Sequence, residues 1–248
     1  MPALASLSAS TVVQLLDPLL AVVFPSACPA CGRALDHPSR GPLCGPCWAR
    51  LPRHREDGVC RCGFPLTPGL VACGRCRRGL TPFEAGGSLG PYEGSLRTLV
   101  HELKYRGRRR VAARLAEELL ASPRIRALLA GDGVLVPVPL HPRRRRERGF
   151  NQSELVAREL STRTGRALCA NALVRRKDTA PQSDLTAAER RRNVAGAFAV
   201  RQRARVAGRV VVLVDDVWTT GATARACARI LREAGAVEVR LLSLARVA

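Results

Sequence analysis

The feature that most constrains the fold is an aliphatic run, Val210–Val214, followed at once by two acids, Asp215 and Asp216. An unbroken apolar run is typical of a strand whose two faces are both covered, as in a parallel sheet. A loop rich in Thr, Thr219–Thr223, comes next and leads into a helical pattern over Ala222–Ala234. In open α/β sheets the ligand binds beyond the carboxyl ends of the strands. The stretch therefore predicts a ligand site at this edge of a sheet.

The residue types of this stretch suit a phosphorylated ligand. At a helix N-terminus, backbone N–H groups and hydroxyls surround a bound monophosphate, and Gly221 lets the backbone approach it closely. The carboxylates of Asp215 and Asp216 suit a vicinal diol or a hydrated Mg²⁺. Successive strand residues point to opposite faces, so both acids serve one ligand only if the chain leaves strand geometry here. Otherwise one acid binds while the other caps a helix or pairs with an Arg, and a generic nucleotide-binding fold is the alternative interpretation.

From about residue 85, helical and strand patterns alternate, which favours an α/β fold with a mainly parallel sheet. One helix is expected to begin at Asn151, which with Glu154 fits a variant of the capping box. A basic loop precedes it, and a long polar loop is expected over 177–193. The other expected helices are Ser95–Lys104, Val111–Ala121 and Ala222–Ala234, and the expected strands are Val134–Val138, Leu168–Val174, Gly196–Val200, Val210–Val214 and Val237–Leu244.

Most of the cysteines lie in a block rich in Cys, Gly, Pro and Arg, whose apolar pattern is too poor for a core of its own. They form two quartets, and paired cysteines let four sulfurs surround one ion, so we expect structural zinc. A disulfide framework is the alternative, disfavoured without an export signal, and the second quartet is less typical because its first pair is spaced by one residue. The first quartet is Cys28, Cys31, Cys44 and Cys47, the second is Cys60, Cys62, Cys73 and Cys76, and Cys169 and Cys227 are expected in the core.

The chain carries 41 Lys and Arg against 20 Asp and Glu, a formal net charge of +21. This excess favours polyanionic partners such as phosphates, nucleic acid or an acidic membrane surface. The apolar segment up to Phe24 lacks a basic start and is interrupted by Asp17 and Pro18. We therefore expect a short helix over 1–25 rather than a signal peptide, and no run reaches the ~18 apolar residues of a membrane span. A cytoplasmic location, where thiols stay reduced, is the expectation, and export is the alternative.

Val210–Thr223 resembles the signature of type I phosphoribosyltransferases, in which four apolar residues and two acids precede Thr-Thr-Gly-x-Thr. Two further stretches, 136–153 and 175–198, together with the paired cysteines, resemble the ComF family over almost the whole chain. This resemblance implies a type I phosphoribosyltransferase fold over 85–248, with a mainly parallel sheet, and a small double zinc ribbon over 26–80. Thr219 stands where purine-salvage relatives often carry an acid that serves the base, which argues against purine salvage.

The resemblance also implies roles for individual residues toward 5-phosphoribosyl pyrophosphate. Asp215 and Asp216, the catalytic pair, would hold the ribose hydroxyls, and the Thr219–Thr223 loop would hold the 5-phosphate. Mg²⁺ would bridge the ribose and the pyrophosphate, and residues 175–193 would close over the site. The arginines near the expected site agree with pyrophosphate binding by their charge. The substrate-binding residues are then Pro137, Val138 and Pro139 in the pyrophosphate turn, Arg143, Arg175, and Thr219, Thr220, Gly221, Ala222 and Thr223 in the loop.

Two functions of different classes follow from these expectations. As an enzyme, the chain would transfer a phosphoribosyl group to an unidentified acceptor and release pyrophosphate, through an oxocarbenium-like transition state stabilised by charge. As a binding protein, it would handle single-stranded DNA in natural competence, together with other competence proteins, while the phosphoribosyl site acts as a sensor or scaffold. Pyrophosphate release would favour the first function, and salt-dependent DNA binding would favour the second.

Overall fold

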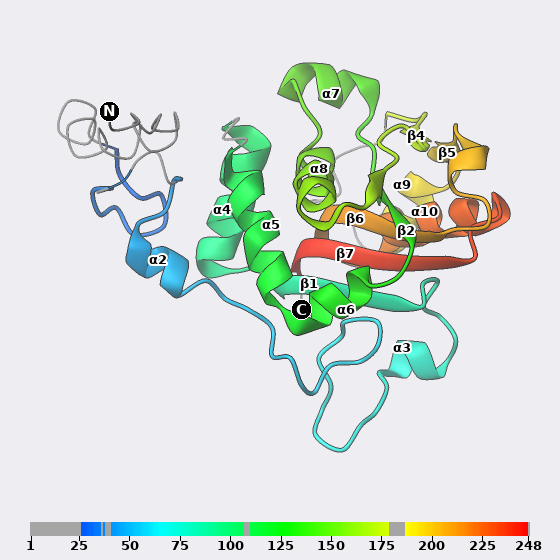
Figure 1. Ribbon diagram of the computed structural model, residues 1–248, viewed down its shortest axis with the longest axis horizontal. Helices are drawn as coiled ribbons and strands as arrows, with labels where there is room; N and C mark the ends of the chain where they lie inside the picture. Colours follow the sequence, from blue (N-terminus) through cyan, green and yellow to red (C-terminus); the bar gives the residue numbers. More distant parts are fainter. Residues whose placement is uncertain (1–25, 36, 38–40, 107–109, 179–186, 248) are drawn as a thin grey trace, which may run out of the picture. The chain divides into compact units, whose positions relative to one another are not determined.

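Figure 1 shows the computed structural model of the chain, which describes residues 26–35, 37, 41–106, 110–178 and 187–247. The helix expected over 1–25 and residues 179–186 of the expected polar loop lie outside the described residues. Within the described ranges, no helix has both the length and the apolar character that crossing a bilayer requires.

The chain folds into two compact units, each built from two segments of sequence. One unit comprises Met1–Pro52 and Glu93–Val111, and the other comprises Arg53–Tyr92 and Ala112–Ala248. The first quartet therefore belongs to one unit and the second quartet to the other. Because compact packing is not the same as independent folding, the domain boundaries expected for 26–80 and 85–248 stay a prediction.

Among the described residues of the unit with the first quartet are the helices α2 (Gly45–Ala49) and α4 (Gly94–Tyr105). Cys44 is the N-cap of α2, and a proline occupies its first turn, where the missing N–H breaks no helical hydrogen bond. Helix α4 confirms the helix expected over 95–104. The expected apolar face is fully buried, at Leu96, Leu99, Val100 and Leu103.

A five-stranded, fully parallel sheet forms the centre of the other unit, in the order β1-β7-β6-β2-β3. The central strand, β6, is buried from Val211 to Val214, which confirms the strand expected from the unbroken apolar run. The strands are β1 (Ala85–Pro91), β2 (Gly133–Pro137), β3 (Ala167–Leu168), β6 (Val210–Trp218) and β7 (Glu238–Arg246).

Helices connect these strands and cover the sheet (Figure 1). Helix α8 (Gln152–Thr164) lies between β2 and β3 in sequence, and α10 (Ala222–Glu233) lies between β6 and β7. The two crossovers run in opposite directions along the sheet, so right-handed connections place α8 and α10 on opposite faces. Two more helices, α5 (Arg110–Ala121) and α6 (Pro123–Leu129), precede β2.

The change of direction falls between β2 and β6, which are neighbours in the sheet. At such a switch point the chain leaves the two adjacent strands toward opposite faces, and a crevice opens at the carboxyl edge of the sheet. The segments at this switch point are the turn after β2 and the loop between β6 and α10. Both contain residues predicted to bind the ligand.

The region after α8 differs from its expected structure. Leu168–Val174 is not one strand, because β3 ends at Leu168 and a turn at Ala170–Asn171 follows. Strand β4 (Leu173–Arg175) pairs antiparallel with β5 (Phe198–Val200) in a separate two-stranded sheet. The stretch expected as a polar loop over 177–193 ends instead in a helix, α9 (Ala187–Val194).

The basic run expected as a loop forms a helix, α7 (Pro142–Arg148). The imidazole Nδ1 of His141 accepts a hydrogen bond from the Arg143 N–H at 3.4 Å, and a proline occupies the first helical position. Gly149 ends the helix with a φ of 77°, a left-handed conformation that glycine adopts without strain. The local signals therefore favour a helix, and Arg itself is a good helix former.

Candidate functional site

The pyrophosphate turn, Pro137–Pro139, lies beside the end of β6. The Val138 N–H donates to the carbonyl of Val214 at 2.8 Å, and the side-chain amide of Asn151 donates to the carbonyl of Val138 at 3.0 Å. All three residues of the turn are buried. The two prolines of this turn have no N–H, and the Val138 N–H already donates to Val214. The turn can therefore contact a ligand through its shape but not through backbone hydrogen-bond donors.

Asp216 is buried and held by helix α8. The side-chain amide of Gln152 donates to Asp216 Oδ2, and Gln152 Oε1 accepts in turn from Arg148 Nη1 at 2.6 Å. The other carboxylate oxygen of Asp216 accepts the N–H of Val217 at 2.5 Å. A buried carboxylate needs such donors because its removal from water is costly. The series Arg148, Gln152, Asp216 therefore fixes this carboxylate at the end of β6.

Asp215 is half-buried and lies on the opposite face of β6. The strand continues through both acids to Trp218, so their side chains alternate between the two faces. Asp216 meets α8, whereas the charge of Asp215 helps to raise the pKa of Cys227 on α10, a shift caused mainly by burial. The chain therefore keeps strand geometry through both acids, and which of them meets a ligand stays a prediction.

The phosphate loop, residues 219–223, joins β6 to α10. Gly221 is the N-cap of this twelve-residue helix, with a φ of 73°, and as a glycine it provides no side-chain cap. A Cβ at Gly221 would lie 2.8 Å from Trp218 Nε1, so both the backbone conformation and the available space favour glycine. The first-turn N–H groups carry the positive end of the helix dipole.

Thr220, in the middle of the phosphate loop, is held through its backbone. Its carbonyl accepts from Arg225 Nη1 at 3.1 Å and from Arg75 Nη1 at 3.4 Å. Its Oγ1 is buried and has no hydrogen-bond partner among the described residues. Leaving such a group unsatisfied destabilises the fold, and a phosphate oxygen at this position would satisfy it. The loop therefore has the donors and the charge of an anion site.

Arg175, at the end of β4, is the buried one of the two arginines predicted to bind substrate. It is 8% exposed, and its guanidinium lies 5.4 Å from the centre of the Phe198 ring. Burial lowers the pKa of Arg175, and the charge of Asp215 is among those that oppose this shift. The structure therefore brings Arg175 into the electrostatic environment of Asp215.

Arg143, the second predicted arginine, lies on the exposed surface of α7. It pairs with Glu147 at 3.0 Å and with Asp178 at 3.5 Å, and its side chain is 68% exposed. His141 also approaches Asp178, with 3.5 Å between Nδ1 and Oδ1. The structure thus gives Arg143 two carboxylate partners, Glu147 and Asp178, and its role toward pyrophosphate stays a prediction.

Gln152 was not predicted to have a role at the site, and Arg148 was expected only as one of the arginines whose charge suits pyrophosphate. Both occur in the stretch 136–153 that resembles the ComF family, so the sequence contained a signal for them. Their role depends on α8 packing against β6, a contact between segments more than 60 positions apart, as the separation of 64 between Gln152 and Asp216 shows.

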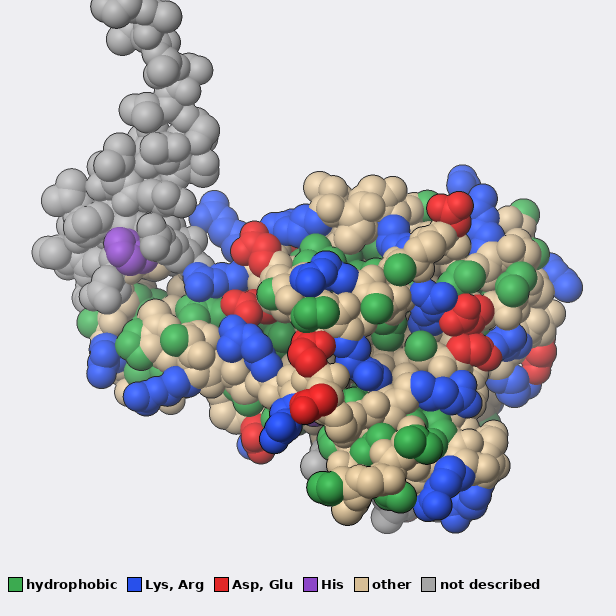
Figure 2. Space-filling model, turned by 60° about the horizontal axis from the view of Figure 1, so that its bottom comes forward, with side chains coloured by type: hydrophobic (Ala, Val, Ile, Leu, Met, Phe, Trp, Pro, Cys, Tyr) green, Lys and Arg blue, Asp and Glu red, His purple; other side chains and the backbone are tan. Residues whose placement is uncertain are grey.

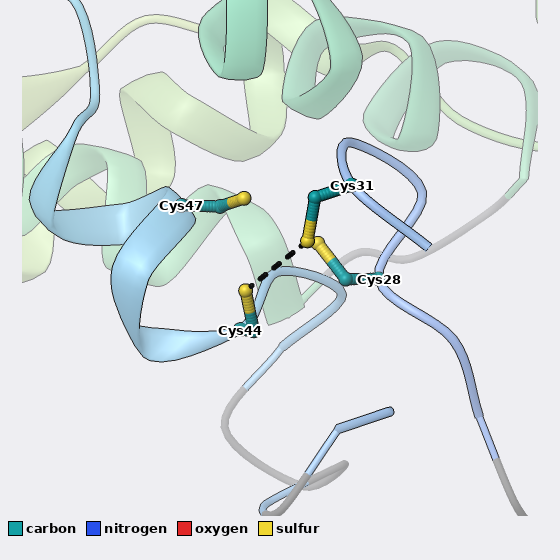
Figure 3. Close-up of side chains that lie close together, drawn as sticks. All are labelled: Cys28, Cys31, Cys44 and Cys47. Carbon is teal, nitrogen blue, oxygen red and sulfur yellow. Dashed lines mark hydrogen bonds between the residues drawn. The ribbon is translucent and has the colours of Figure 1, made fainter. Parts of the chain in front are cut away.

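The first quartet has the geometry of a closed metal site. Figure 3 shows its four sulfurs directed toward one point, with Cys28 and Cys31 on a turn and Cys44 and Cys47 at the start of α2. The sulfurs lie within 4.8 Å of one another. Burial raises the pKa of Cys28, but hydrogen bonds from backbone groups, first that of Cys44, lower it to about 7, whereas burial and the neighbouring thiols raise the pKa of Cys47 to about 12. The arrangement of the four sulfurs fits one tetrahedral Zn²⁺, which binds cysteines as thiolates.

The second quartet forms an equivalent cluster despite its unusual first pair. Its four sulfurs also lie within 4.8 Å of one another, with 3.6 Å between the sulfurs of Cys62 and Cys73. The Cys73 N–H donates to Cys60 Sγ at 3.3 Å. None of the ten cysteines forms a disulfide, so the disulfide framework is wrong and the donor set again fits zinc. Cys169 and Cys227 are buried, as expected.

Comparison with known proteins adds independent support. Family models match a double zinc ribbon domain at residues 19–77 and a phosphoribosyl transferase domain at residues 147–248. The chain is 38% identical over 208 residues to the DNA utilization protein YhgH of Salmonella typhimurium. The matched residues are 82% of this chain and 90% of that protein.

Two proteins with competence in their names are also similar. Competence protein F of Haemophilus influenzae is 29% identical over 214 residues, which is 85% of this chain and 93% of that protein. Competence protein ComFC of Bacillus subtilis is 36% identical over 102 residues, which is 41% of this chain and 39% of that protein. With its parallel sheet, its phosphate loop and its two cysteine quartets, this chain belongs to the ComF family, in which a double zinc ribbon accompanies a phosphoribosyltransferase-type domain.

Proposed function

We propose that this chain binds 5-phosphoribosyl pyrophosphate together with Mg²⁺ at the switch point between β2 and β6. The observation that carries the proposal is the start of α10, where a helix N-terminus with a glycine N-cap follows Thr220, whose buried hydroxyl has no hydrogen-bond partner among the residues that the structure describes. The 5-phosphate would accept hydrogen bonds from the backbone N–H groups at the start of α10 and from the Thr220 hydroxyl. A polar crevice at the carboxyl edge of an open sheet is the place where such ligands bind.

Different residues at this edge of the sheet would contact different parts of the ligand. Residues 219–223 hold the 5-phosphate, and Asp215 faces the ribose hydroxyls and the metal. Asp216, fixed by Gln152, supports this end of β6 and completes the acidic pair. The pyrophosphate turn shapes the far end of the site, and Arg175 adds positive charge there. Arg143 would contact the ligand only if its guanidinium separated from the carboxylates of Glu147 and Asp178.

The reaction that this arrangement supports is phosphoribosyl transfer. The bond between ribose C1 and the pyrophosphate oxygen breaks, an acceptor atom bonds to C1, and pyrophosphate leaves with the electron pair. Positive charge develops on the ribose in the transition state, and the acids near the diol stabilise it. Asp215 would hold Mg²⁺, which would supply positive charge to balance that of the leaving pyrophosphate. The acceptor is unidentified, and no general base stands out among the described residues of the crevice.

A second candidate function is the binding of single-stranded DNA, with 5-phosphoribosyl pyrophosphate acting as a signal and other competence proteins as partners. It is favoured by the net charge of +21. Lys and Arg side chains are spread over the face shown in Figure 2, with fewer acidic side chains among them. The names of the relatives refer to DNA utilization and competence. A salt-dependent affinity for single strands would support this function.

Zinc in both quartets and a cytoplasmic location belong to the same proposal. Two closed four-sulfur clusters support zinc. Thiolates that hold zinc must stay reduced, which the cytoplasm provides. Metal analysis of protein purified under reducing conditions should give two zinc ions per chain, and a value of one or none would contradict this assignment.

The proposed function is tested by calorimetric titration of zinc-loaded protein with 5-phosphoribosyl pyrophosphate in the presence of Mg²⁺. We expect saturable binding by the wild type and none by the double variant Asp215→Asn/Asp216→Asn. The matched control is Asp132→Asn, because Asp132 is exposed just before β2, away from the carboxyl edge. The proposal is wrong if the folded wild type does not bind, or if the double variant binds as well as the control.

A further inference from the structure

The second quartet is built directly onto the sheet that carries the phosphate loop. The Gly86 N–H, on β1, donates to the carbonyl of Arg61 at 2.8 Å, and a Cβ at Gly86 would lie 2.7 Å from the carbonyl oxygen of Cys62. Arg124, on α6, donates to the carbonyls of Cys60 and Gly86 at 2.5 and 3.2 Å. The cysteine turn and the sheet are thus in backbone contact.

Arg246, the last residue of β7, is buried between this quartet and the phosphate loop. It is 6% exposed, and its guanidinium lies 3.8 Å from the centre of the Trp218 ring and 4.7 Å from that of Phe64. It lines one small cavity together with Cys62 and Cys73. Burial lowers the pKa of Arg246, and the charge and hydrogen bond of Cys62 oppose this shift.

The surroundings of Arg246 contain no carboxylate partner. Among the described residues, no ion pair joins Arg246 to an acid, and its Nε and Nη1 have no hydrogen-bond partner. A buried cation without an anion is strongly unfavourable. The groups available to balance it are the aromatic faces and the sulfurs of the second quartet.

A zinc ion held by four thiolates supplies the missing negative charge. The ion contributes two positive charges and the thiolates four negative ones, so the loaded site carries two net negative charges, whereas four thiols carry none. We propose that Arg246 is the counter-cation of a metal site at the second quartet, and that the metal thereby positions the phosphate loop.

Two contacts link the quartet to the loop. Arg246 stacks on Trp218, the residue before the loop, and the Trp218 indole nitrogen lies 2.8 Å from the position that a Cβ of Gly221 would take. Arg75, which belongs to α3 (Gly74–Arg77) beside Cys73 and Cys76, donates to the carbonyl of Thr220 at 3.4 Å. The part of the proposal that concerns the loop rests on the proposed function, whereas the part that concerns the metal does not.

The charge balance fixes the sign of the expected effect. Removal of the guanidinium destabilises the negatively charged, metal-loaded site more than the neutral thiols, so the affinity for metal falls. Changes in groups that contact metal ligands typically reduce metal affinity about 10- to 100-fold. Only the second quartet should respond, because the first quartet belongs to the other compact unit.

The experiment measures zinc release from the full chain to a chromophoric chelator, for wild type, Arg246→Lys and Arg246→Met. Wild type should release two equivalents slowly. Arg246→Met should release one of them at least about tenfold faster. Arg246→Lys should be intermediate, because a lysine keeps the charge but loses the planar stacking and the fork of donors. Arg229→Met, an exposed arginine on α10, is the matched control and should behave as wild type.

The outcomes separate the metal site from the phosphate loop. If Arg246→Met releases both equivalents at the wild-type rate, the counter-cation proposal is overturned. If Arg246→Met does not fold, the uncharged but polar variant Arg246→Gln takes its place, and wild-type release by Arg246→Gln overturns the proposal. In a second measurement, wild type bound to 5-phosphoribosyl pyrophosphate should lose affinity when one zinc is removed. Unchanged affinity would overturn the coupling, and no binding by loaded wild type would overturn the proposed function while the release data still stand.

Discussion

The side-chain amide of Gln152, on α8, donates a hydrogen bond to the buried carboxylate of Asp216, at the end of β6. Helix α8 covers one face of the sheet, and the loop after β6 leads to α10 on the other face. The hydrogen bond therefore connects the two elements that meet where the chain changes direction. It spans the switch point at which we place the ligand. Its loss should affect both the stability of the sheet edge and the affinity of the site.

We expect Gln152→Ala to lower the free energy of unfolding by about 1–3 kcal/mol, because a buried carboxylate loses a donor. The affinity for 5-phosphoribosyl pyrophosphate should fall roughly tenfold, which corresponds to about 1.4 kcal/mol. Urea denaturation and calorimetric titration measure the two effects. Gln202→Ala is the control, because Gln202 is exposed and makes no side-chain cap. Equal results for the two variants would contradict the positioning role of Gln152.

The two acids should respond differently to the same substitution. Asp215→Asn should reduce the affinity for 5-phosphoribosyl pyrophosphate and Mg²⁺ by about 10- to 100-fold with little effect on stability, because Asp215 is half-buried and, in the proposed function, faces the ligand. Asp216→Asn should instead lower the free energy of unfolding by about 1–3 kcal/mol, since an amide oxygen replaces only one of two oxygens that accept hydrogen bonds. If Asp215→Asn binds as wild type, the assignment of Asp215 to the ligand is wrong.

Gly221 allows a test that separates backbone strain from close packing. Gly221→Ala should destabilise the protein more than Gly208→Ala, although the two φ angles are nearly equal, at 73° and 69°. A Cβ at Gly208 meets nothing within 4 Å, whereas one at Gly221 would lie 2.8 Å from Trp218 Nε1. The excess should be about 1–3 kcal/mol, as for overpacked sites, measured by thermal unfolding. Equal destabilisation would show that the loop accommodates the methyl group.

The central part of the fold could be predicted from the sequence because its signals are local. The apolar run of β6 and the start of α10 depend on residues that are adjacent in the chain. Strand β1 was not predicted, because its sequence, Ala-Gly-Gly-Ser-Leu-Gly-Pro, has a poor strand propensity. Its glycines reflect tertiary packing, since a Cβ at Gly87 would lie 2.7 Å from Ile125 Cδ1.

The candidate site was predictable to the same extent. The phosphate loop and the acids follow from one continuous motif. The links from Gln152 to Asp216 and from Arg246 to the second quartet join distant segments, and neither spacing nor composition indicates them. Arg143 and Arg175 illustrate the same limit, because both occur near the expected site in sequence, yet only Arg175 is buried near Asp215.

His54 makes stability depend on pH. Burial lowers the pKa of His54, and the charges of Arg246 and Arg124 lower it further. The folded state therefore binds this proton less readily than the unfolded state, whose histidine has a pKa near 6.5. The contribution of His54 to stability is fully present above about pH 6.5, and it is lost as the pH falls from there toward the lower folded value.

We expect the urea midpoint of wild type to fall between about pH 7.5 and pH 5.5, and that of His54→Asn to fall less, because asparagine does not titrate. The comparison uses the change with pH, so an overall loss of stability from altered packing at position 54 does not affect it. His37→Asn is the control, since His37 is exposed, and its midpoint should follow wild type. Parallel decreases in wild type and His54→Asn would show that His54 does not couple protonation to folding, and that the guanidinium of Arg246 does not act on it.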